Sequence, residues 1–409
     1  MGKIDILPGK LRGIVTVPGS KSAAHRAIIC AGLARGETLI ENVDLCDDII
    51  ATLGGISALG AKAEKRGNNI VITGIGGREH RDFIPRIDCK ESGSTARFLI
   101  PVALAVAGAG RFTGTKGLAK RPFDVYFDIF KSHGIKYTQN LPGFDLKLAG
   151  GFKGGNFTLP GNVSSQFITG LLFALPLCRE NSEITLTTPL QSVGYVDMTL
   201  DMLQKFGITV EQEGYETFRV PGNQVYHARN ITVESDWSQA GFWYAAKALG
   251  SSVDILGLDP HSTQGDRVVA EHCERFSRPG DVDIDVSGCP DLLPPLAVMA
   301  AIRQGTTRFV NAARLRMKES DRLATTAAAL NALGGRAEEG PDSLTVHGIS
   351  AFAGGTVDGA NDHRIVMAAA IAATHSAAPV TILGAEAVKK SYPSFWEDYK
   401  MLGGVVHVL

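Results

Sequence analysis

A tight turn and the start of a helix are encoded by Pro18-Gly19-Ser20-Lys21-Ser22-Ala23-Ala24-His25-Arg26. Serine at position 20 or 22 can cap the free backbone N–H groups of the helix, and the alanine-rich stretch that follows supplies an apolar helix body. Lys21 and Arg26 add two cations to a helix terminus that already carries partial positive charge. The segment predicts either an ordinary capped helix or a helix start that binds an anion, and alone it does not decide between them.

The same kind of segment recurs six times along the chain. A small polar loop opens each copy, and an apolar helix, a short turn and a strand follow it. The openings stand at Ser20, Ser92, Ser164, Asp236, Asp291 and Asp362, so that successive spacings are 72, 72, 72, 55 and 71 residues. Because each copy also carries a second helix and further β-runs, the repeating unit is predicted as β-α-β-α-β-β.

The second helix of each copy is predicted by an amphipathic stretch that ends before a turn. These stretches cover residues 49–59, 124–133, 198–206, 267–276, 321–333 and 394–402, and β-runs are expected at 134–137 and 207–210. The first helices, for example 99–109 and 167–175, are apolar nearly all round. We therefore expect the first helices to be buried between sheets.

Six copies divide into three plus three, which predicts two similar domains of about 200 residues each. The boundary is expected near Val233-Glu234-Ser235, just before the fourth copy. Parallel buried helices bring their N-termini to one face of each domain. Two such faces are expected to form a cleft that binds anions.

Composition excludes several classes of protein. The 409 residues are 44% hydrophobic and 20% charged, with a net charge of −1, which is typical of a soluble globular protein rather than a nucleic-acid binder or a disordered chain. The six cysteines are scattered without a C-x-x-C pair, which argues against a zinc ribbon or a disulfide framework and fits a reducing cytoplasm. No apolar run is long enough to span a bilayer, and the N-terminus lacks a signal core. We expect a cytoplasmic protein that binds neither nucleic acid nor membrane.

The run from Arg314 to Arg322 is dense in charge, with five charged residues in the seven positions from Arg316 onward. Arg316 and Asp321 are typical of a solvated helix end. Lys318, Glu319 and Arg322 fit a different role, because a carboxylate between cations can stay ionised or exchange protons near neutral pH. The run predicts a general acid or base.

Other polar residues at the openings have two interpretations each. Asp291 and Asp362 are expected to be helix caps by default, and His363 is more often a hydrogen-bonded structural group than a catalyst. Cations gather on the same loops in a protein with no excess of positive charge, namely Lys21, Arg26, Arg97, Arg121, Lys318, Arg322, Arg364 and Lys390. This concentration predicts small, highly anionic substrates such as phosphates and carboxylates.

Eight motifs in order resemble the 5-enolpyruvylshikimate-3-phosphate (EPSP) synthase family, and the resemblance covers essentially the whole chain. The motifs are P-G-S-K-S-x-x-x-R at 18–26, S-G-S-T-A-R at 92–97, K-R-P at 120–122, G-N-V-S-S-Q-F at 161–167, C-P-D-L-L-P at 289–294, K-E-S-D-R at 318–322, N-D-H-R at 361–364 and K-K-S-Y-P at 389–393. The resemblance implies an α/β fold of two domains, an inside-out α/β barrel in which each domain has three βαβαββ units around buried parallel helices. It implies one domain over residues 20–234, a second made of 1–19 and 235–409, and an active site in the cleft between them.

The resemblance also implies the reaction and the site. Enolpyruvyl is transferred from phosphoenolpyruvate to the 5-hydroxyl of shikimate-3-phosphate and phosphate is released, in chorismate and aromatic amino acid biosynthesis, without metal or cofactor and with inhibition by glyphosate. Shikimate-3-phosphate is expected on Lys21, Ser22, Arg26, Ser164, Ser165, Gln166, Ser192, Asp291 and Lys318. Phosphoenolpyruvate is expected on Lys21, Gly93, Arg121, Gln166, Arg322, Arg364 and Lys390.

The same resemblance assigns the proton transfers. Asp291 takes the proton from the 5-hydroxyl, and Glu319, helped by Lys21, handles the proton at the methylene carbon. A monomer is expected. Two positions depart from the family pattern: Glu91 stands where many members have Asn, and Arg314 stands where some members bind substrate through Asn.

Two other functions compete with this prediction. The sister enzyme that acts on UDP-N-acetylglucosamine uses a reactive cysteine near the counterpart of 117–122 and opens with Lys-Asn, whereas this chain has no cysteine there and opens with Lys21-Ser22. A non-catalytic or RNA-processing relative is expected to show a basic surface or to lack the carboxylate pair. The net charge of −1 and the presence of Asp291 and Glu319 argue against it.

Overall fold

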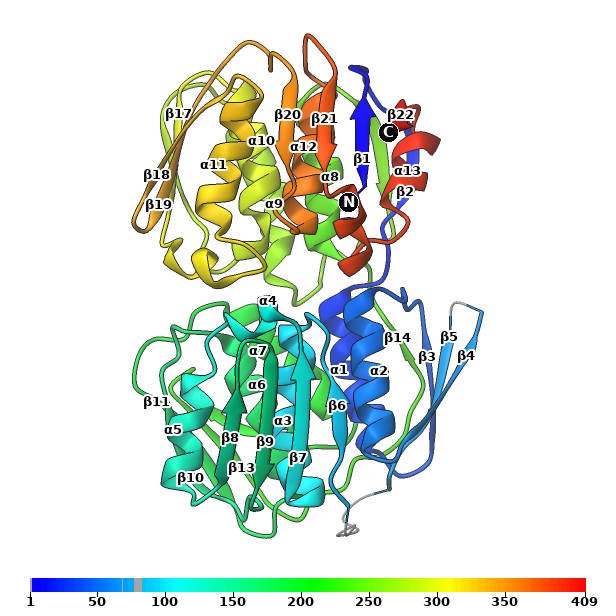
Figure 1. Cartoon of the computed structure of the whole chain (residues 1–409), viewed down its shortest axis with the longest axis vertical. Helices are drawn as coiled ribbons and strands as arrows, with labels where there is room; N and C mark the ends of the chain where they lie inside the picture. The colour runs from blue at the N-terminus through cyan, green and yellow to red at the C-terminus, as the bar shows by residue number, and fades with distance from the viewer. Residues whose placement is uncertain (1, 68, 77–82) are drawn as a thin grey trace. The chain divides into compact units, whose positions relative to one another are not determined.

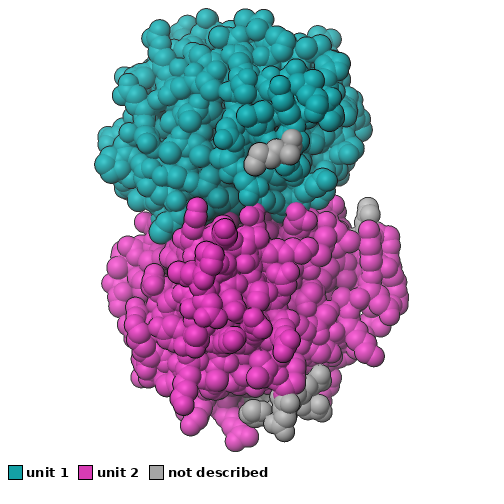
Figure 2. Space-filling view, in the orientation of Figure 1, with its two compact units in different colours: residues 1–18, 235–409 teal, residues 19–234 magenta. Residues whose placement is uncertain are grey.

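The structure, a computed structural model, describes residues 2–67, 69–76 and 83–409. The chain divides into two compact units, coloured in Figure 2. Unit 1 consists of Met1–Pro18 and Ser235–Leu409, and unit 2 consists of Gly19–Glu234. The chain thus passes from one unit to the other after Pro18 and after Glu234, whereas the sequence places these passages after residues 19 and 234.

Unit 2 holds the first three copies of the repeat (Figure 1). Its helices are α1 (Lys21–Leu33), α2 (Asp47–Ala58), α3 (Gly93–Ala107), α4 (Lys116–Ala119), α5 (Asp124–Ser132), α6 (Ser165–Ala174), η1 (Leu175–Leu177) and α7 (Val193–Lys205). Its described strands form three sheets in the orders β14-β3-β5-β4, β6-β7-β9-β8 and β10-β11-β13-β12. The strands are β3 (Glu37–Glu41), β4 (Lys62–Arg66), β5 (Asn69–Thr73), β6 (Arg86–Asp88), β7 (Ala109–Gly114), β8 (Lys136–Asn140), β9 (Phe144–Ala149), β10 (Gly155–Leu159), β11 (Ser182–Leu186), β12 (Glu211–Glu213), β13 (Thr217–Val220) and β14 (Ile231–Thr232).

Unit 1 holds the other three copies and both ends of the chain. Its helices are α8 (Trp237–Ala248), η2 (Gly265–Val268), α9 (Val269–Phe276), η3 (Pro290–Leu292), α10 (Leu293–Ile302), η4 (Ala313–Met317), α11 (Arg322–Ala332), α12 (His363–Ala373), η5 (Ala385–Lys390) and α13 (Phe395–Met401). Its strands are β1 (Lys3–Ile6), β2 (Arg12–Thr16), β15 (Ser252–Leu256), β16 (Val282–Asp285), β17 (Thr306–Val310), β18 (Arg336–Gly340), β19 (Ser343–His347), β20 (Gly355–Asp358), β21 (Val380–Leu383) and β22 (Val406–Val408). They form sheets in the orders β20-β21-β1-β22, β16-β17-β19-β18 and β15-β2.

The predicted β-α-β-α-β-β unit is confirmed by the strand pairing. In the second copy, β6 and β7 flank α3 and pair in parallel, and β8 and β9 then form an antiparallel hairpin that joins β7 through β9. The third and fifth copies repeat this arrangement. When two consecutive strands of a sheet are parallel, the helix that connects them packs on one face of that sheet.

The fourth copy departs from the prediction. Its sheet contains β15 and β2 alone in the part of the chain that the structure describes, and no hairpin follows α9. The spacing of 55 residues after Asp236, against 71 or 72 elsewhere, corresponds to this missing hairpin. The opening strands of two copies are also exchanged, because β2 of the first copy pairs with β15 and β14 of the fourth pairs with β3.

Cap residues fix where the first helices begin. Ser20, Ser92, Ser164, Asp236 and Asp362 each accept a backbone N–H of the helix that follows. Asp291 does not, because it lies within η3 and the N-cap position of α10 is Leu292. The expectation that Asp291 caps the following helix is therefore wrong, and its carboxylate pairs with cations instead.

Several element boundaries differ from the prediction, among them the start of α7, which lies at Val193 and not at residue 198. The stretch expected as a helix over 267–276 begins as η2 and becomes α-helical at Val269, and the β-run expected at 207–210 is irregular, with β12 beginning at Glu211. The first helices are buried as expected; in unit 1, α8, α10 and α12 contact one another. Among the described helices none combines the length and the apolar character needed to cross a membrane.

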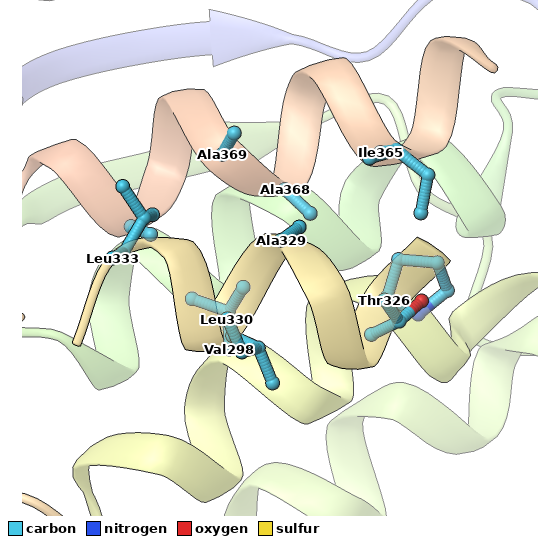
Figure 3. A pocket seen from close by; sticks show the side chains of 10 residues that line it. Val298, Thr326, Ala329, Leu330, Leu333, Ile365, Ala368 and Ala369 are labelled. Atoms are coloured by element: carbon cyan, nitrogen blue, oxygen red, sulfur yellow. The ribbon is translucent and has the colours of Figure 1, made fainter. Parts of the chain in front are cut away.

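A small apolar cavity lies between α10, α11 and α12. Its volume is about 10 Å³, and its lining includes Val298, Leu330 and Ile365 from the three helices. Figure 3 shows these side chains together with Thr326, which is the polar member of the lining. The cavity belongs to the core of unit 1 and not to the candidate site.

Candidate functional site

Three cations surround the carboxylate of Asp291 in unit 1. Arg322 Nη1 lies 2.7 Å and Lys318 Nζ 3.2 Å from Asp291 Oδ1, and Arg364 Nη2 lies 3.0 Å from Oδ2. Asp291 belongs to η3, Lys318 precedes α11, and Arg322 and Arg364 lie in the first turns of α11 and α12. The starts of α10, α11 and α12 therefore meet at one carboxylate.

The cations keep Asp291 ionised. Burial by itself would raise the pKa of this carboxyl, but Arg364, Lys318 and Arg322 outweigh burial and hold the pKa well below its usual value. Burial lowers the pKa of the Lys318 ammonium, and Asp291 opposes that effect. The cluster combines an ionised carboxylate with a lysine that releases its proton more easily than an exposed one.

Arg322 is the hub of this cluster. Its side chain is 1% exposed, and Nη2 donates to Glu319 Oε2 at 2.6 Å while Nε donates to Asp362 Oδ2 at 2.9 Å. Burial would lower the pKa of Arg322, but Asp362, Glu319 and Asp291 raise it. The guanidinium of Arg322 therefore contacts both predicted proton-transfer residues, Asp291 and Glu319.

Arg364 and Lys390 lie beside this cluster. Arg364 donates to Asp291 O at 3.1 Å and to Ser238 Oγ at 2.9 Å, so the start of α8 joins the site as well. Lys390 Nζ donates to Asn361 O at 2.7 Å, just before α12. Four cations of unit 1, namely Lys318, Arg322, Arg364 and Lys390, thus lie at one end of its buried helices.

Arg316 and Asp321 have structural partners, and His363 lies beside Asp362. Arg316 pairs with Asp321 at 2.7 Å and with Glu339 at 3.2 Å, and Asp321 accepts the N–H of Ala324 as the cap of α11. This agrees with the interpretation of Arg316 and Asp321 as a helix end. His363 is buried, with Nδ1 3.8 Å from Asp362 Oδ1.

In unit 2, Lys21 forms an ion pair with a residue that the sequence did not single out. Lys21 Nζ donates to Asp48 Oδ2 at 2.9 Å, and both side chains are mostly buried. Lys21 begins α1, and Asp48 is the second residue of α2. The pair joins the starts of two helices.

Arg26 is buried one turn further along α1. Nε donates to Thr199 Oγ1 at 2.9 Å, and Nη1 and Nη2 donate to Ser22 O and Tyr195 O, both at 2.7 Å. Burial lowers the pKa of this guanidinium to about 10. Arg26 therefore ties α1 to the start of α7, where the predicted site residue Ser192 is buried with a left-handed backbone (φ 57°).

Two polar neighbours hold the amide of Gln166. Gln166 Nε2 donates to Ser94 Oγ at 2.9 Å, and Arg97 Nη1 donates to Gln166 Oε1 at 2.8 Å. Arg97 also donates to Pro122 O at 2.9 Å, and its guanidinium lies over the rings of Phe123 and Phe167. Sequence reasoning placed Arg97 among loop cations, but it is buried within α3 and connects α3, α6 and the segment after Arg121.

Gly93 begins α3 against Arg121. A Cβ at position 93 would lie 2.4 Å from Arg121 Nη1, so the absence of a side chain allows this guanidinium to approach the helix start. Ser164 caps α6, and Ser165 is buried in its first turn. Glu91, unexplained by the sequence, accepts a hydrogen bond from Thr115 Oγ1 at 3.3 Å, and Thr115 caps α4.

The predicted site residues thus fall into two groups. Unit 2 brings together the starts of α1, α2, α3 and α6, and unit 1 brings together those of α8, α10, α11 and α12. Sequence reasoning missed Asp48 and Ser238. A signal for Asp48 exists in the Asp47-Asp48 pair at the start of a predicted helix, whereas Ser238 could not be told from a capping serine.

The chain matches the model of a known family over residues 7–399, described as EPSP synthase (3-phosphoshikimate 1-carboxyvinyltransferase). It is 45% identical over 422 residues to the 3-phosphoshikimate 1-carboxyvinyltransferase of Clostridium perfringens strain 13, with 99% of each chain covered. It is 44% identical over 428 residues to the protein of the same name from Clostridioides difficile strain 630, with 99% of this chain and 98% of the relative covered.

A solved structure agrees with these relatives. The EPSP synthase from Acinetobacter baumannii superposes with a TM-score of 0.83 at 26% identity, with 100% of both chains covered. The predicted α/β fold and the predicted resemblance are confirmed by these matches. The chain belongs to the EPSP synthase family, whose members are 3-phosphoshikimate 1-carboxyvinyltransferases.

Proposed function

We propose that this chain transfers the enolpyruvyl group of phosphoenolpyruvate to the 5-hydroxyl of shikimate-3-phosphate and releases phosphate. One observation carries the proposal: the buried guanidinium of Arg322 contacts the carboxylates of both Asp291 and Glu319. Addition to an alkene needs a base on the attacking hydroxyl and an acid on the alkene carbon. Two carboxylates held at the two ends of one guanidinium supply this pair.

The chemistry proceeds in two balanced steps. In the first step the oxygen of the 5-hydroxyl bonds to carbon 2 of phosphoenolpyruvate, and Asp291 accepts the proton of that hydroxyl. Protonated Glu319 donates a proton to the methylene carbon. In the second step Glu319 takes a proton back from the resulting methyl group, the double bond reforms, and phosphate leaves with the proton that Asp291 had accepted. Lys21 assists the transfer at the methylene carbon.

Anionic substrates are proposed to make Asp291 a better base. With its cations fully engaged, Asp291 has a depressed pKa and holds a proton poorly. A phosphate or carboxylate that binds Arg364, Arg322 or Lys318 adds negative charge next to Asp291 and competes for its cations, which raises its pKa. Substrate binding therefore prepares the base for proton transfer.

The substrates are proposed to use residues of both units. Shikimate-3-phosphate is assigned Lys21, Ser22, Arg26, Ser164, Ser165, Gln166 and Ser192 of unit 2 with Asp291 and Lys318 of unit 1. Phosphoenolpyruvate is assigned Lys21, Gly93, Arg121 and Gln166 of unit 2 with Arg322, Arg364 and Lys390 of unit 1. The clustering of these side chains at helix starts within each unit supports both sets, because helix N-termini favour anions.

The protein is further proposed to act as a monomer in the cytoplasm. None of the six cysteines forms a disulfide, and five of them are buried, as suits a reducing compartment. Each unit has its own large hydrophobic core. Neither core needs a second copy of the chain for its burial.

Phosphate release tests the reaction. The purified chain with shikimate-3-phosphate and phosphoenolpyruvate is expected to release phosphate, and the same protein with UDP-N-acetylglucosamine in place of shikimate-3-phosphate is expected to release none. Asp291→Asn and Glu319→Gln should each lower kcat by roughly 10²- to 10⁴-fold, the usual contribution of a positioned acid or base.

A matched control separates catalysis from charge loss in general. Glu339→Gln removes a carboxylate of the same unit that pairs with Arg316 near the surface, and it should leave kcat unchanged. Circular dichroism verifies that each variant is folded. Near-normal turnover in Asp291→Asn or Glu319→Gln would remove that residue from its proposed role.

A further inference from the structure

Two successive contacts join α1 to α2 beneath the proposed substrate residues. Lys21 and His25 are four residues apart on α1, and Asp48 and Thr52 are four residues apart on α2, so each pair lies one helical turn apart on one face. Lys21 pairs with Asp48 at 2.9 Å, and His25 Nδ1 contacts Thr52 Oγ1 at 2.7 Å. The ion pair is therefore followed, one turn deeper, by a neutral hydrogen bond.

The neutral contact continues into α3. Thr52 Oγ1 lies 2.7 Å from Thr95 Oγ1, and Thr95 Oγ1 donates to Ser92 Oγ at 2.8 Å. Ser92 is the cap of α3, directly before Gly93, and Thr95 Oγ1 also lies 3.4 Å from Asp48 O. One chain of side chains thus connects the helix starts that carry Lys21, Asp48 and Gly93.

One tautomer of His25 allows every contact of this series to be made with one proton per hydroxyl: Nδ1–H donates to Thr52, Thr52 donates to Thr95, and Thr95 donates to Ser92. His25 Nε2, the other ring nitrogen, has no hydrogen-bond partner among the described residues. Burial, the main cause, lowers the pKa of His25 to about 3, so the ring stays neutral at physiological pH.

None of the residues in this hydrogen-bonded series is a proposed substrate contact. Every one is buried: His25 is 1% exposed, Ser92 1%, and Thr52 and Thr95 0%. We propose that Thr52, held between His25 and Thr95, is a positioning residue that fixes the register of α1 against α2 and thereby the Lys21–Asp48 pair. The inference rests on the proposed function only where it uses Lys21 as a substrate contact. A shift of α2 along α1 would move both contacts together, so the buried contact restrains the more exposed one.

Thr52→Val tests the role, because valine matches threonine in shape and removes the hydroxyl. It should lower kcat/KM for phosphoenolpyruvate by roughly 3- to 30-fold, which lies within the range of about 2- to 150-fold that coupled neighbours show. Thr52→Ser keeps the hydroxyl and should restore most of the loss. Thr38→Val is the matched control, because Thr38 is also 0% exposed in unit 2 but its hydroxyl has no partner among the described residues. It should leave the kinetics unchanged.

A double-mutant comparison separates positioning from a merely structural role. If Thr52 acts through Lys21, then Thr52→Val should have little further effect in a Lys21→Met background. Equal fold losses in both backgrounds, or losses that follow thermal stability alone, would overturn the proposal. Should Thr52→Val fail to fold, His25→Asn and His25→Leu replace it: the asparagine amide can stand where Nδ1 stands and should retain activity, whereas leucine should not.

A measurement that does not depend on enzyme activity tests this inference separately from the proposed function. Acetylation of Lys21 by acetic anhydride, measured by mass spectrometry, should be several-fold faster in Thr52→Val than in the wild type or in Thr38→Val, because a loosened pair exposes the amine. An inactive wild type would contradict the proposed function and leave this measurement standing. Unchanged acetylation of Lys21 in Thr52→Val would contradict the positioning role even in an active enzyme.

Discussion

Gly93 shows how one missing side chain sets the position of a cation. Its amide starts α3, and the nearest atom to an added Cβ is Nη1 of Arg121, at 2.4 Å. That contact is the end of a flexible side chain and not backbone, so a methyl group there would displace the guanidinium and leave the helix intact. The position therefore controls where the guanidinium of Arg121 lies.

Gly93→Ala is accordingly expected to distinguish two ligands of different length. The displaced Arg121 and the new methyl group should affect glyphosate, which is longer than phosphoenolpyruvate, more than the substrate itself. An overpacking cost of about 1–3 kcal/mol corresponds to a rise of roughly 5- to 150-fold in the inhibition constant, with a much smaller rise in KM. Steady-state inhibition kinetics measure both constants.

Gly54→Ala is a suitable control for this substitution, because Gly54 lies within α2 and an added Cβ there meets nothing within 4 Å. Its kinetics should match those of the wild type. Equal increases of the inhibition constant and KM in Gly93→Ala would show that the methyl group disturbs the helix start as a whole.

Among the elements, helix starts were predictable and helix partners were not. A serine or aspartate cap predicts where each of α1, α3, α6, α8 and α12 begins, because a capping side chain bonds to a backbone N–H only two or three residues further along the sequence. The ion pair between Lys21 and Asp48 depends on the packing of α1 on α2, which no local pattern encodes. The same holds for Arg97, whose charge suggested a loop although two aromatic rings and Gln166 hold it inside unit 2.

The irregular fourth copy marks a second limit. Its spacing of 55 residues was visible in the sequence, yet the loss of a hairpin could not be located without knowing which strands pair. The exchange of β2 and β14 is likewise a matter of long-range pairing. The sequence repeat therefore predicted the architecture. The missing hairpin and the exchanged strands could be identified only from the strand pairing in the structure.

Between α10, α11 and α12, Thr326 lies in the lining of the small apolar cavity (Figure 3). The residue is 2% exposed, and its hydroxyl has no hydrogen-bond partner among the described residues. Thr326→Val keeps the shape of the side chain and removes a buried unsatisfied group, so it should raise the free energy of unfolding by about 1–2 kcal/mol. Urea unfolding at constant m-value measures the change.

The neighbouring threonine supplies a control of opposite sign. Thr325 Oγ1 donates to Asp321 O at 2.8 Å and contacts Ser320 Oγ at 3.0 Å, so Thr325→Val removes satisfied hydrogen bonds and should destabilise the protein. Destabilisation by both variants would mean that the Thr326 hydroxyl has a partner after all, such as a water molecule.

At the scale of the whole molecule, the proposed ligands of shikimate-3-phosphate are divided unequally between the units. Seven belong to unit 2, whereas Asp291 and Lys318 belong to unit 1. The three tryptophans, Trp237, Trp243 and Trp396, all lie in unit 1. Tryptophan fluorescence therefore reports the unfolding of the unit that supplies the smaller share of the ligands.

Shikimate-3-phosphate at about 100 times its Kd should stabilise the folded state by about 2.7 kcal/mol and raise Tm by roughly 5 °C or more. If unit 1 takes part in binding, the tryptophan transition should move by this amount. Lys318→Met should reduce the shift at the same saturation, because it removes one of the two proposed unit 1 contacts. A tryptophan transition that stays in place while calorimetry shows binding would assign the ligand to unit 2 alone. A full shift in Lys318→Met would remove Lys318 from the proposed set of ligands.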